Sequence, residues 1–212
     1  MAATNYEKIV TLAVVNYQST WGNKRAGLDK IKKLAKRAAD QDNNIIVFPE
    51  MALTGYESGG SKDMYRESAE LVPGPATDEL AELARKLDVY LVLGMPERDR
   101  ANPDIIYNSS AVLGPEGFIG RYRKIGLSPP PFYDESLYFT PGRELPVFET
   151  RYGIIGVQIC RDFWLYPEQT RILVLKGARL IVNPTASPKG ADGGIFLTQQ
   201  TRARATENMV YA

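Results

Sequence analysis

The sequence contains no histidine, and it contains a single cysteine, Cys160, in 212 residues. Without histidine, Ser-His-Asp and Cys-His mechanisms are excluded, as is any metal site that needs a histidine ligand. One cysteine forms no disulfide within the chain and cannot supply the several thiolates of a zinc or iron–sulfur site. Acid–base catalysis must therefore use Glu, Asp, Lys or Tyr, and we expect neither a metal nor a cofactor.

Long apolar runs and a large net charge are also absent. The longest apolar runs, Ile45–Phe48 and Val89–Leu93, are far too short to span a bilayer, and the first residues lack a basic-then-apolar signal pattern. The net charge of +1 implies no broad basic surface, so nucleic acid is not an expected partner. The lone cysteine fits a reducing compartment, so the sequence predicts a cytoplasmic protein with no membrane partner.

The chain is organised around the stretch GIIGVQICRDFWLYPE, at residues 153–168. Its apolar first half predicts a buried strand over Gly153–Ile159, which leads directly to Cys160 and then to a polar, aromatic turn. Pro167 and Glu168 open a helical pattern, since proline and an acidic residue both suit a first helical turn. The only thiol is therefore predicted where a strand ends and turns toward a helix, a place where α/β folds present reactive groups.

Predicted strands and helices alternate along the rest of the chain, with hairpins inserted between them. Helices are expected over residues 23–40, 62–70, 77–87, 167–176 and 192–207, with Thr77 as an N-cap. Strands are expected over residues 8–15, 45–48, 90–94, 108–114, 118–123, 145–150, 153–159 and 179–182. Residues 124–142 form a long loop, which is usually a sign of function. With no repeat or linker, the sequence predicts one domain, 1–212, of α/β class with a mixed sheet.

Three residues of complementary chemistry each follow a predicted strand, namely Glu50, Lys124 and Cys160. If those strands are neighbours in one sheet, the three side chains meet at one edge. A desolvated Glu50 with a raised pKa could then take the thiol proton, while Lys124 and the Arg161 backbone N–H stabilise an oxyanion. Each residue also has an ordinary interpretation, as a small buried apolar thiol, a loop carboxylate or a solvated lysine.

Three segments in this order, VFPEMALTGYE, GRYRKIGL and GVQICRDFW, resemble the signature segments of the nitrilase superfamily, the carbon–nitrogen hydrolases. The likeness extends from about residue 8 to the last residue, with further support from YNS, YFTPG, KGARLIVNPTAS and RARATEN. It implies a four-layer α-β-β-α sandwich, assembled as a homodimer or larger homo-oligomer. It also implies that Tyr211-Ala212 begins a strand, so we expect the C-terminal part of this fold to be missing.

The resemblance implies a role for each of the three residues. Glu50 would be the general base, Lys124 would stabilise the tetrahedral intermediate, and Cys160 would form a thioester that water cleaves. The family also has a second glutamate in the loop after the lysine. Glu135 is the best match, because FYDESLYFTPG resembles the carbamoyl-amide branch, and Asp134 is the alternative.

Aromatic residues near the expected site are candidates for the wall of a pocket for a small apolar or amine-bearing substrate. They are Tyr56, Phe132, Tyr133, Phe163, Trp164 and Tyr166, of which about half are expected to face the ligand. Arg161 and Asn183 are further candidate substrate contacts, although Asn183 has an alternative role as a turn residue before Pro184. The family has one fewer residue between Asp162 and Pro167, so the pair Leu165-Tyr166 predicts an altered wall beside the cysteine.

The sequence therefore predicts a thiol amidohydrolase that cleaves a linear amide, either a carboxamide or an N-carbamoyl group, and releases ammonia. The alternatives are a nitrilase, an ammonia-supplying glutaminase domain of an NAD synthetase-like enzyme, and a non-catalytic relative that binds a small amide or a protein partner. The intact set of Glu50, Lys124 and Cys160 argues against a non-catalytic relative. The carbamoyl-branch likeness around Glu135 argues against the glutaminase domain.

Overall fold

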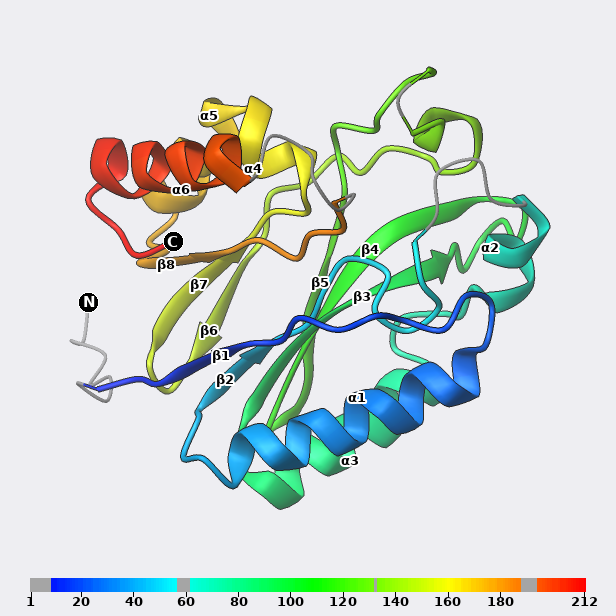
Figure 1. Cartoon of the computed structure of the whole chain (residues 1–212), viewed down its shortest axis with the longest axis horizontal. Coiled ribbons are helices and arrows are strands. Elements are labelled where there is room, and N and C mark those ends of the chain that lie inside the picture. Colours follow the sequence, from blue (N-terminus) through cyan, green and yellow to red (C-terminus); the bar gives the residue numbers. More distant parts are fainter. Residues whose placement is uncertain (1–8, 57–61, 132, 188–193) are drawn as a thin grey trace.

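The computed structural model describes residues 9–56, 62–131, 133–187 and 194–212. Within these ranges, a pair of β-sheets lies between outer layers of helices (Figure 1). The first sheet has the order β1 (Leu12–Val14), β2 (Ile45–Val47), β3 (Tyr90–Arg98), β4 (Ile106–Gly114) and β5 (Gly117–Arg123). The second has the order β6 (Val147–Thr150), β7 (Gly153–Val157) and β8 (Leu180–Val182).

The helices cover the outer faces of the two sheets. On the first sheet lie α1 (Lys24–Ala39) and α3 (Pro75–Leu87), and on the second lie α4 (Arg161–Leu165), α5 (Pro167–Leu175) and α6 (Ile195–Asn208) (Figure 1). The short α2 (Lys62–Ser68) and the 3-10 helix η1 (Glu135–Leu137) lie in the connections. None of the helices in the described ranges is long and apolar enough to cross a bilayer.

Alternation of side chains along the strands explains why the sandwich has four layers. In β2, Ile46 belongs to the core beneath α1 and α3, whereas Ile45 and Val47 belong to the core between the two sheets. In β3, Leu91 packs on the helix side and Val92 on the side of the second sheet. Because successive strand residues point to opposite faces, an all-apolar strand fills two cores at once. The predicted α-β-β-α sandwich is confirmed.

Both sheets are mixed, as expected, but the expected arrangement of the three site strands is wrong. Strands β1, β2 and β3 are parallel, β3, β4 and β5 are antiparallel, and β7 pairs antiparallel with β6 and parallel with β8. The strands before Glu50 and Lys124, β2 and β5, are separated by β3 and β4, and the strand before Cys160 is in the other sheet. The three residues approach one another because the sheets pack face to face.

Local differences from the sequence prediction have identifiable causes. The N-cap of α3 is Gly74, and Thr77 lies in the first turn, where its Oγ1 accepts a hydrogen bond of 2.7 Å from the Gly74 N–H. The predicted turn after Cys160 is the helix α4, whose five residues are too few to show a helical period. Lys8 and residues 192–193, at the starts of the first predicted strand and last predicted helix, lie outside the described residues.

Tyr211 pairs with the edge strand β8 near the end of the chain. It forms an isolated parallel bridge with Leu180, in which its N–H donates to the carbonyl of Arg179 and its carbonyl accepts from the N–H of Ile181, each at 2.9 Å. Tyr211 thus takes the position of a first residue of a further strand beside β8, as the resemblance implied.

Gly94 on β3 allows the segment that carries Glu50 to pack closely. A Cβ atom at this position would lie 2.4 Å from the backbone nitrogen of Met51 and 2.7 Å from the Cα of Glu50. We expect Gly94→Ala to displace this segment and to lower the free energy of unfolding by about 1–3 kcal/mol, the usual cost of overpacking.

The matched control is Ser110→Ala. Ser110 lies on β4 directly opposite Gly94 of β3, and its buried Oγ has no hydrogen-bond partner. Removing that hydroxyl should leave the stability unchanged or slightly raised. Denaturant unfolding of both variants measures the difference. A Gly94→Ala variant as stable as Ser110→Ala would show that the close approach at Gly94 is unimportant.

Candidate active site

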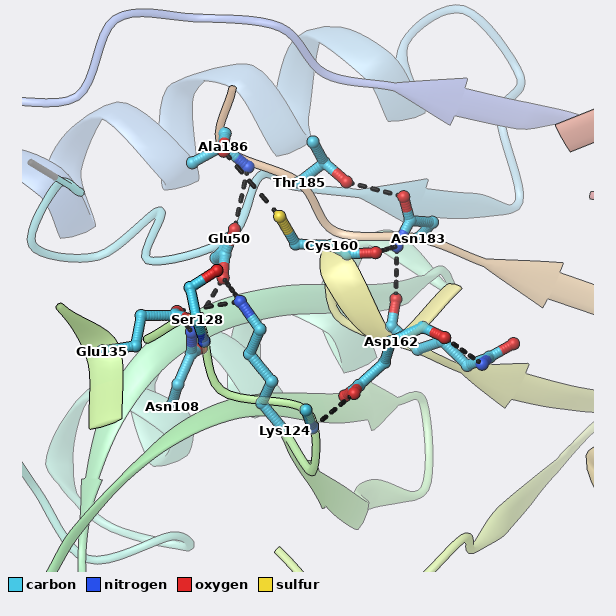
Figure 2. A network of polar contacts seen from close by, with 12 residues as sticks. Glu50, Asn108, Lys124, Ser128, Glu135, Cys160, Asp162, Asn183, Thr185 and Ala186 are labelled. Atoms are coloured by element: carbon cyan, nitrogen blue, oxygen red, sulfur yellow. Dashed lines mark hydrogen bonds and ion pairs between the residues drawn. The ribbon is translucent and has the colours of Figure 1, made fainter. Parts of the chain in front are cut away.

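Glu50 is a buried carboxylate placed by the end of β2. Pro49 interrupts the strand pattern, and the following side chain turns into the space between the sheets, where it is 2% exposed. Its Oε1 accepts hydrogen bonds of 2.8 Å from both Lys124 Nζ and Asn108 Nδ2, and its Oε2 accepts one of 3.0 Å from the Ala186 backbone N–H (Figure 2). A buried carboxylate with three donors is held in one orientation.

Lys124 follows β5 and carries its ammonium group between two carboxylates. Its Nζ lies 2.8 Å from Glu50 Oε1 and 2.8 Å from Glu135 Oε1, and the residue is 1% exposed (Figure 2). Glu135 also accepts hydrogen bonds from the Ser128 N–H at 2.9 Å and from Asn108 Nδ2 at 3.1 Å. Glu135, and not the half-buried Asp134, is therefore the acidic residue of this loop that contacts Lys124.

Cys160 lies at the sharp turn between β7 and α4, with a positive φ of 49° that non-glycine residues rarely adopt. The turn is held by hydrogen bonds from the Cys160 N–H to the Pro184 carbonyl at 2.9 Å and from Asn183 Nδ2 to the Cys160 carbonyl at 3.3 Å. The sulfur points toward Ala186, whose carbonyl lies 3.9 Å from Sγ (Figure 2). The backbone of Ala186 therefore contacts both the thiol and Glu50.

Lys124 and Cys160 line a cavity of about 190 Å³. The predicted contacts Tyr56, Tyr133, Arg161 and Trp164 also line it, together with Ser128, Leu165, Ala186 and Phe196. A larger cavity of about 540 Å³ lies elsewhere, around Arg121 and Arg123, and contains none of the three predicted catalytic residues. We assign the small cavity as the candidate substrate site, because it contains the thiol.

Some of the other predicted wall residues are used differently. Asn183 does not line the cavity, and its Oδ1 accepts hydrogen bonds from Trp164 Nε1 at 3.1 Å and Thr185 Oγ1 at 2.6 Å. Phe163 is buried in the core between α5 and the second sheet, and Tyr166 is not a lining residue. Phe132 lies outside the described residues. Leu165, from the longer segment after the cysteine, does form part of the wall.

Burial sets the protonation states of the site. It raises the pKa of Glu50 above its ordinary 4.5, although the nearby charge of Lys124 opposes the shift. Burial and then the charge of Glu50 raise the pKa of Cys160 well above 9.0. For Lys124, burial lowers the pKa, but the charges of Glu50, Cys160 and Glu135 outweigh it and the net shift is upward. At neutral pH the resting site therefore holds a neutral thiol beside a charged ammonium group.

Asp162 links the turn at Cys160 to the loop after Lys124 by hydrogen bonds. Its Oδ2 accepts hydrogen bonds from the Ile125 N–H at 3.0 Å and the Tyr122 hydroxyl at 2.5 Å, and its Oδ1 accepts one from the Gly126 N–H at 2.6 Å. Burial raises the pKa of Asp162, and these donors oppose that shift by stabilising the carboxylate. One carboxylate thus links the two sheets beside the reactive groups.

Two contributors to the site could not be assigned a role from the sequence. Asn108 bridges the two glutamates through Nδ2, but it lies within β4, and the segment YNS that contains it indicated the family without indicating this role. Ala186 acts through its backbone, so its side chain carries no information about the role. Within the described ranges, no cluster of three or more Cys, Asp or Glu residues is placed to hold a metal ion.

Comparisons with known proteins identify the family of the chain. The sequence model of the family described as "Carbon-nitrogen hydrolase" matches residues 11–212. The nitrilase of Pyrococcus abyssi is 38% identical over 186 residues, which cover 86% of this chain and 65% of that protein. Omega-amidase NIT2 of Danio rerio is 35% identical over 195 residues, which cover 89% of this chain and 67% of that protein.

A solved structure supports the same assignment. Saccharomyces cerevisiae Nit3, a member of branch 10 of the nitrilase superfamily, has a TM-score of 0.84 and 28% identity, covering 99% of this chain and 76% of that one. The chain spans about two thirds of the length of the two curated relatives, 65% and 67%. The match over nearly the whole of the present sequence shows that this chain belongs to the carbon–nitrogen hydrolase family, the nitrilase superfamily.

Proposed function

We propose that this protein is a thiol amidohydrolase that hydrolyses a linear amide through an acyl-enzyme on Cys160. The observation that carries the proposal is a cavity that Lys124 and Cys160 both line, with Glu50 paired to Lys124 at 2.8 Å, in a chain that has no histidine to act as a base. The membership of the carbon–nitrogen hydrolase family supports it. The amidase name of the 35% identical relative favours an amide as the substrate.

Acylation uses the two ionisable neighbours of the thiol in turn. Glu50 takes the proton from the Cys160 thiol, and the sulfur forms a bond with the carbonyl carbon of the amide. The carbonyl oxygen becomes an oxyanion that Lys124 Nζ and the Arg161 backbone N–H stabilise. The C–N bond then breaks, and the leaving nitrogen takes the proton from Glu50 and departs as ammonia.

Deacylation repeats these steps with water. Glu50 removes a proton from a water molecule, whose oxygen attacks the thioester carbon and displaces the sulfur. The carboxylic acid leaves, and the thiol recovers its proton from Glu50. Glu135 does not contact the thiol and instead holds Lys124 in place, because it shares the ammonium group with Glu50.

Nitrile hydrolysis is a second candidate, favoured by the nitrilase name of the 38% identical relative. A thiol adds to a nitrile carbon in the same geometry, and hydrolysis of the resulting thioimidate gives the same thioester and ammonia. Comparing ammonia release from one amide and from the nitrile of the same carbon skeleton distinguishes the two. A faster reaction with the nitrile would favour this second candidate.

Three variants test the proposed roles. Cys160→Ala should reduce ammonia release from every accepted amide to background, because no nucleophile remains. Glu50→Gln keeps the shape but cannot take a proton, and Lys124→Ala removes an oxyanion donor, so each should lower kcat by about 100-fold or more. Circular dichroism should show that the folded state persists.

The matched control is Glu149→Gln, which makes the same chemical change at an exposed residue of β6 and should retain full activity. A Cys160→Ala protein that still releases ammonia at an appreciable rate would rule out the thioester mechanism. A Glu50→Gln protein as active as Glu149→Gln would remove Glu50 from the role of base.

The pH dependence of kcat/KM should follow Glu50. Its pKa is raised above 4.5 by burial, and only the ionised form takes a proton, so activity should fall as the pH drops through a value higher than 4.5. The thiol pKa lies well above 9.0, so the rate should stay level from neutral pH to about pH 9. A rate that rises through the region of an ordinary thiol pKa would show instead that Cys160 ionises without the help of Glu50.

A further inference from the structure

Arg204 is a buried arginine on α6, the helix that packs against α4 and α5 on the outer side of the second sheet (Figure 1). Its Nε donates a hydrogen bond of 3.1 Å to the Phe163 carbonyl, and its Nη2 donates one of 2.9 Å to the Trp164 carbonyl. Its Nη1 lies 3.1 Å from Glu207 Oε1. Two of the three nitrogens of this guanidinium group therefore bind the backbone of α4.

The two carbonyls lie at the C-terminal end of α4, where a helix has no donors of its own for its last carbonyls. A helix of five residues is also too short to be stable by itself. The guanidinium group supplies the missing donors and places a positive charge at the negative end of the helix. The preceding carbonyl, that of Asp162, accepts a hydrogen bond of 3.1 Å from Gln158 Nε2. Side chains from outside α4 thus hold this end of the helix.

The other end of α4 carries the thiol. Cys160 is the N-cap of the helix, and its backbone is bound there by the Pro184 carbonyl and by Asn183 Nδ2. A short helix that is held at both ends cannot turn or slide without moving the sulfur. A displacement of about 1 Å can cost a factor of about 100 in rate when a reacting group has to meet its partners in one geometry.

We propose that Arg204 is a positioning residue for the nucleophile, because its hold on the far end of α4 keeps the Cys160 thiol where Glu50 and Lys124 can act on it. The inference rests on the proposed amidase function and adds to it a residue that does not line the cavity.

The wall of the cavity has supports that do not involve Arg204. The Trp164 side chain donates from Nε1 to Asn183 Oδ1 at 3.1 Å, and its ring packs edge-on against Phe196, with 6.4 Å between the ring centroids. Loss of Arg204 should therefore displace the thiol more than the wall, and the effect on the reaction should appear in kcat more than in KM.

Arg204→Met tests this role, because methionine keeps an unbranched apolar stem but lacks the guanidinium group. We expect kcat for an accepted amide to fall by about 10- to 100-fold and KM to change by less than about 3-fold. The assay is run well below the midpoint of thermal unfolding, and circular dichroism confirms that the variant is folded. A purely structural role would lower that midpoint and leave kcat per folded molecule unchanged, which would overturn the proposal.

The reactivity of the thiol provides a second readout that a loss of stability alone does not change. The chain has one cysteine, so alkylation by iodoacetamide, followed by mass spectrometry of the intact protein, reports on Cys160 alone. At neutral pH the buried thiol is protonated and depends on Glu50 and Lys124 to react. We expect alkylation of folded Arg204→Met to be slower than that of the wild type by about 10-fold or more, with equal rates in denaturant. A folded variant that is alkylated as fast as the wild type would overturn the proposal.

Two variants on the same helix provide the matched controls. Arg202→Met makes the same chemical change at an exposed position of α6. Glu207→Gln removes the charged partner of Arg204 and leaves both hydrogen bonds to α4 in place. Both variants should keep the kcat and the alkylation rate of the wild type.

Arg204→Lys carries the test if the methionine variant does not fold. Lysine keeps the positive charge and an apolar stem, but it lacks the planar fork that reaches two carbonyls at once. We expect a smaller loss, about 3- to 10-fold in both kcat and the alkylation rate. In that case, a lysine variant with wild-type values of both would overturn the proposal.

The two readouts also separate this inference from the proposed function. If alkylation depends on Arg204 but the wild-type protein releases no ammonia from any amide, the positioning role stands and the amidase function fails. If ammonia is released and neither kcat nor alkylation depends on Arg204, the positioning role alone is refuted.

Discussion

The buried ammonium group of Lys124 is the interaction on which the rest of the site depends. It lies between Glu50 and Glu135 at 2.8 Å from each and is almost fully shielded from water. Removing one charged partner from such a buried ion pair lowers the free energy of unfolding by about 3–5 kcal/mol, because the remaining charges are left uncompensated. The protein therefore has to keep all three residues together, and that requirement fixes the position of the carboxylate that faces the thiol.

The two sheets supply different residues of this site. The first sheet supplies Glu50, Asn108 and Lys124 from three of its strands or strand ends, and the second supplies Cys160 at the turn into α4. Asp162 joins the two halves by accepting hydrogen bonds from the backbone just after Lys124. The turn at Cys160, with its positive φ, points the sulfur toward the backbone of Ala186. Hydrogen bonds to the backbone and buried ion pairs thus fix the orientation of the reactive side chains.

Much of the fold and of the candidate site could be predicted from the sequence. The parts that could not be predicted depend on tertiary contacts, which a sequence pattern does not show. Glu50, Lys124 and Cys160 were predicted because each follows an apolar strand and lies in a segment that resembles the family. The strands before these three residues do not share one sheet, and the sequence could not show this because a strand pattern does not say which sheet the strand joins. Asn108 had no assigned role because it lies in mid-strand, and the role of Ala186 lies in its backbone.

The proposed mechanism requires that Cys160 form a covalent acyl-enzyme, with Glu50 as its base and Lys124 as its charged neighbour. The decisive measurement is mass spectrometry of the intact protein, quenched in acid during turnover of an accepted amide. We expect a mass increase equal to the acyl group, located on the peptide that contains Cys160 and absent from the Cys160→Ala protein. Ammonia release without any such adduct, or an adduct on another residue, would contradict the mechanism.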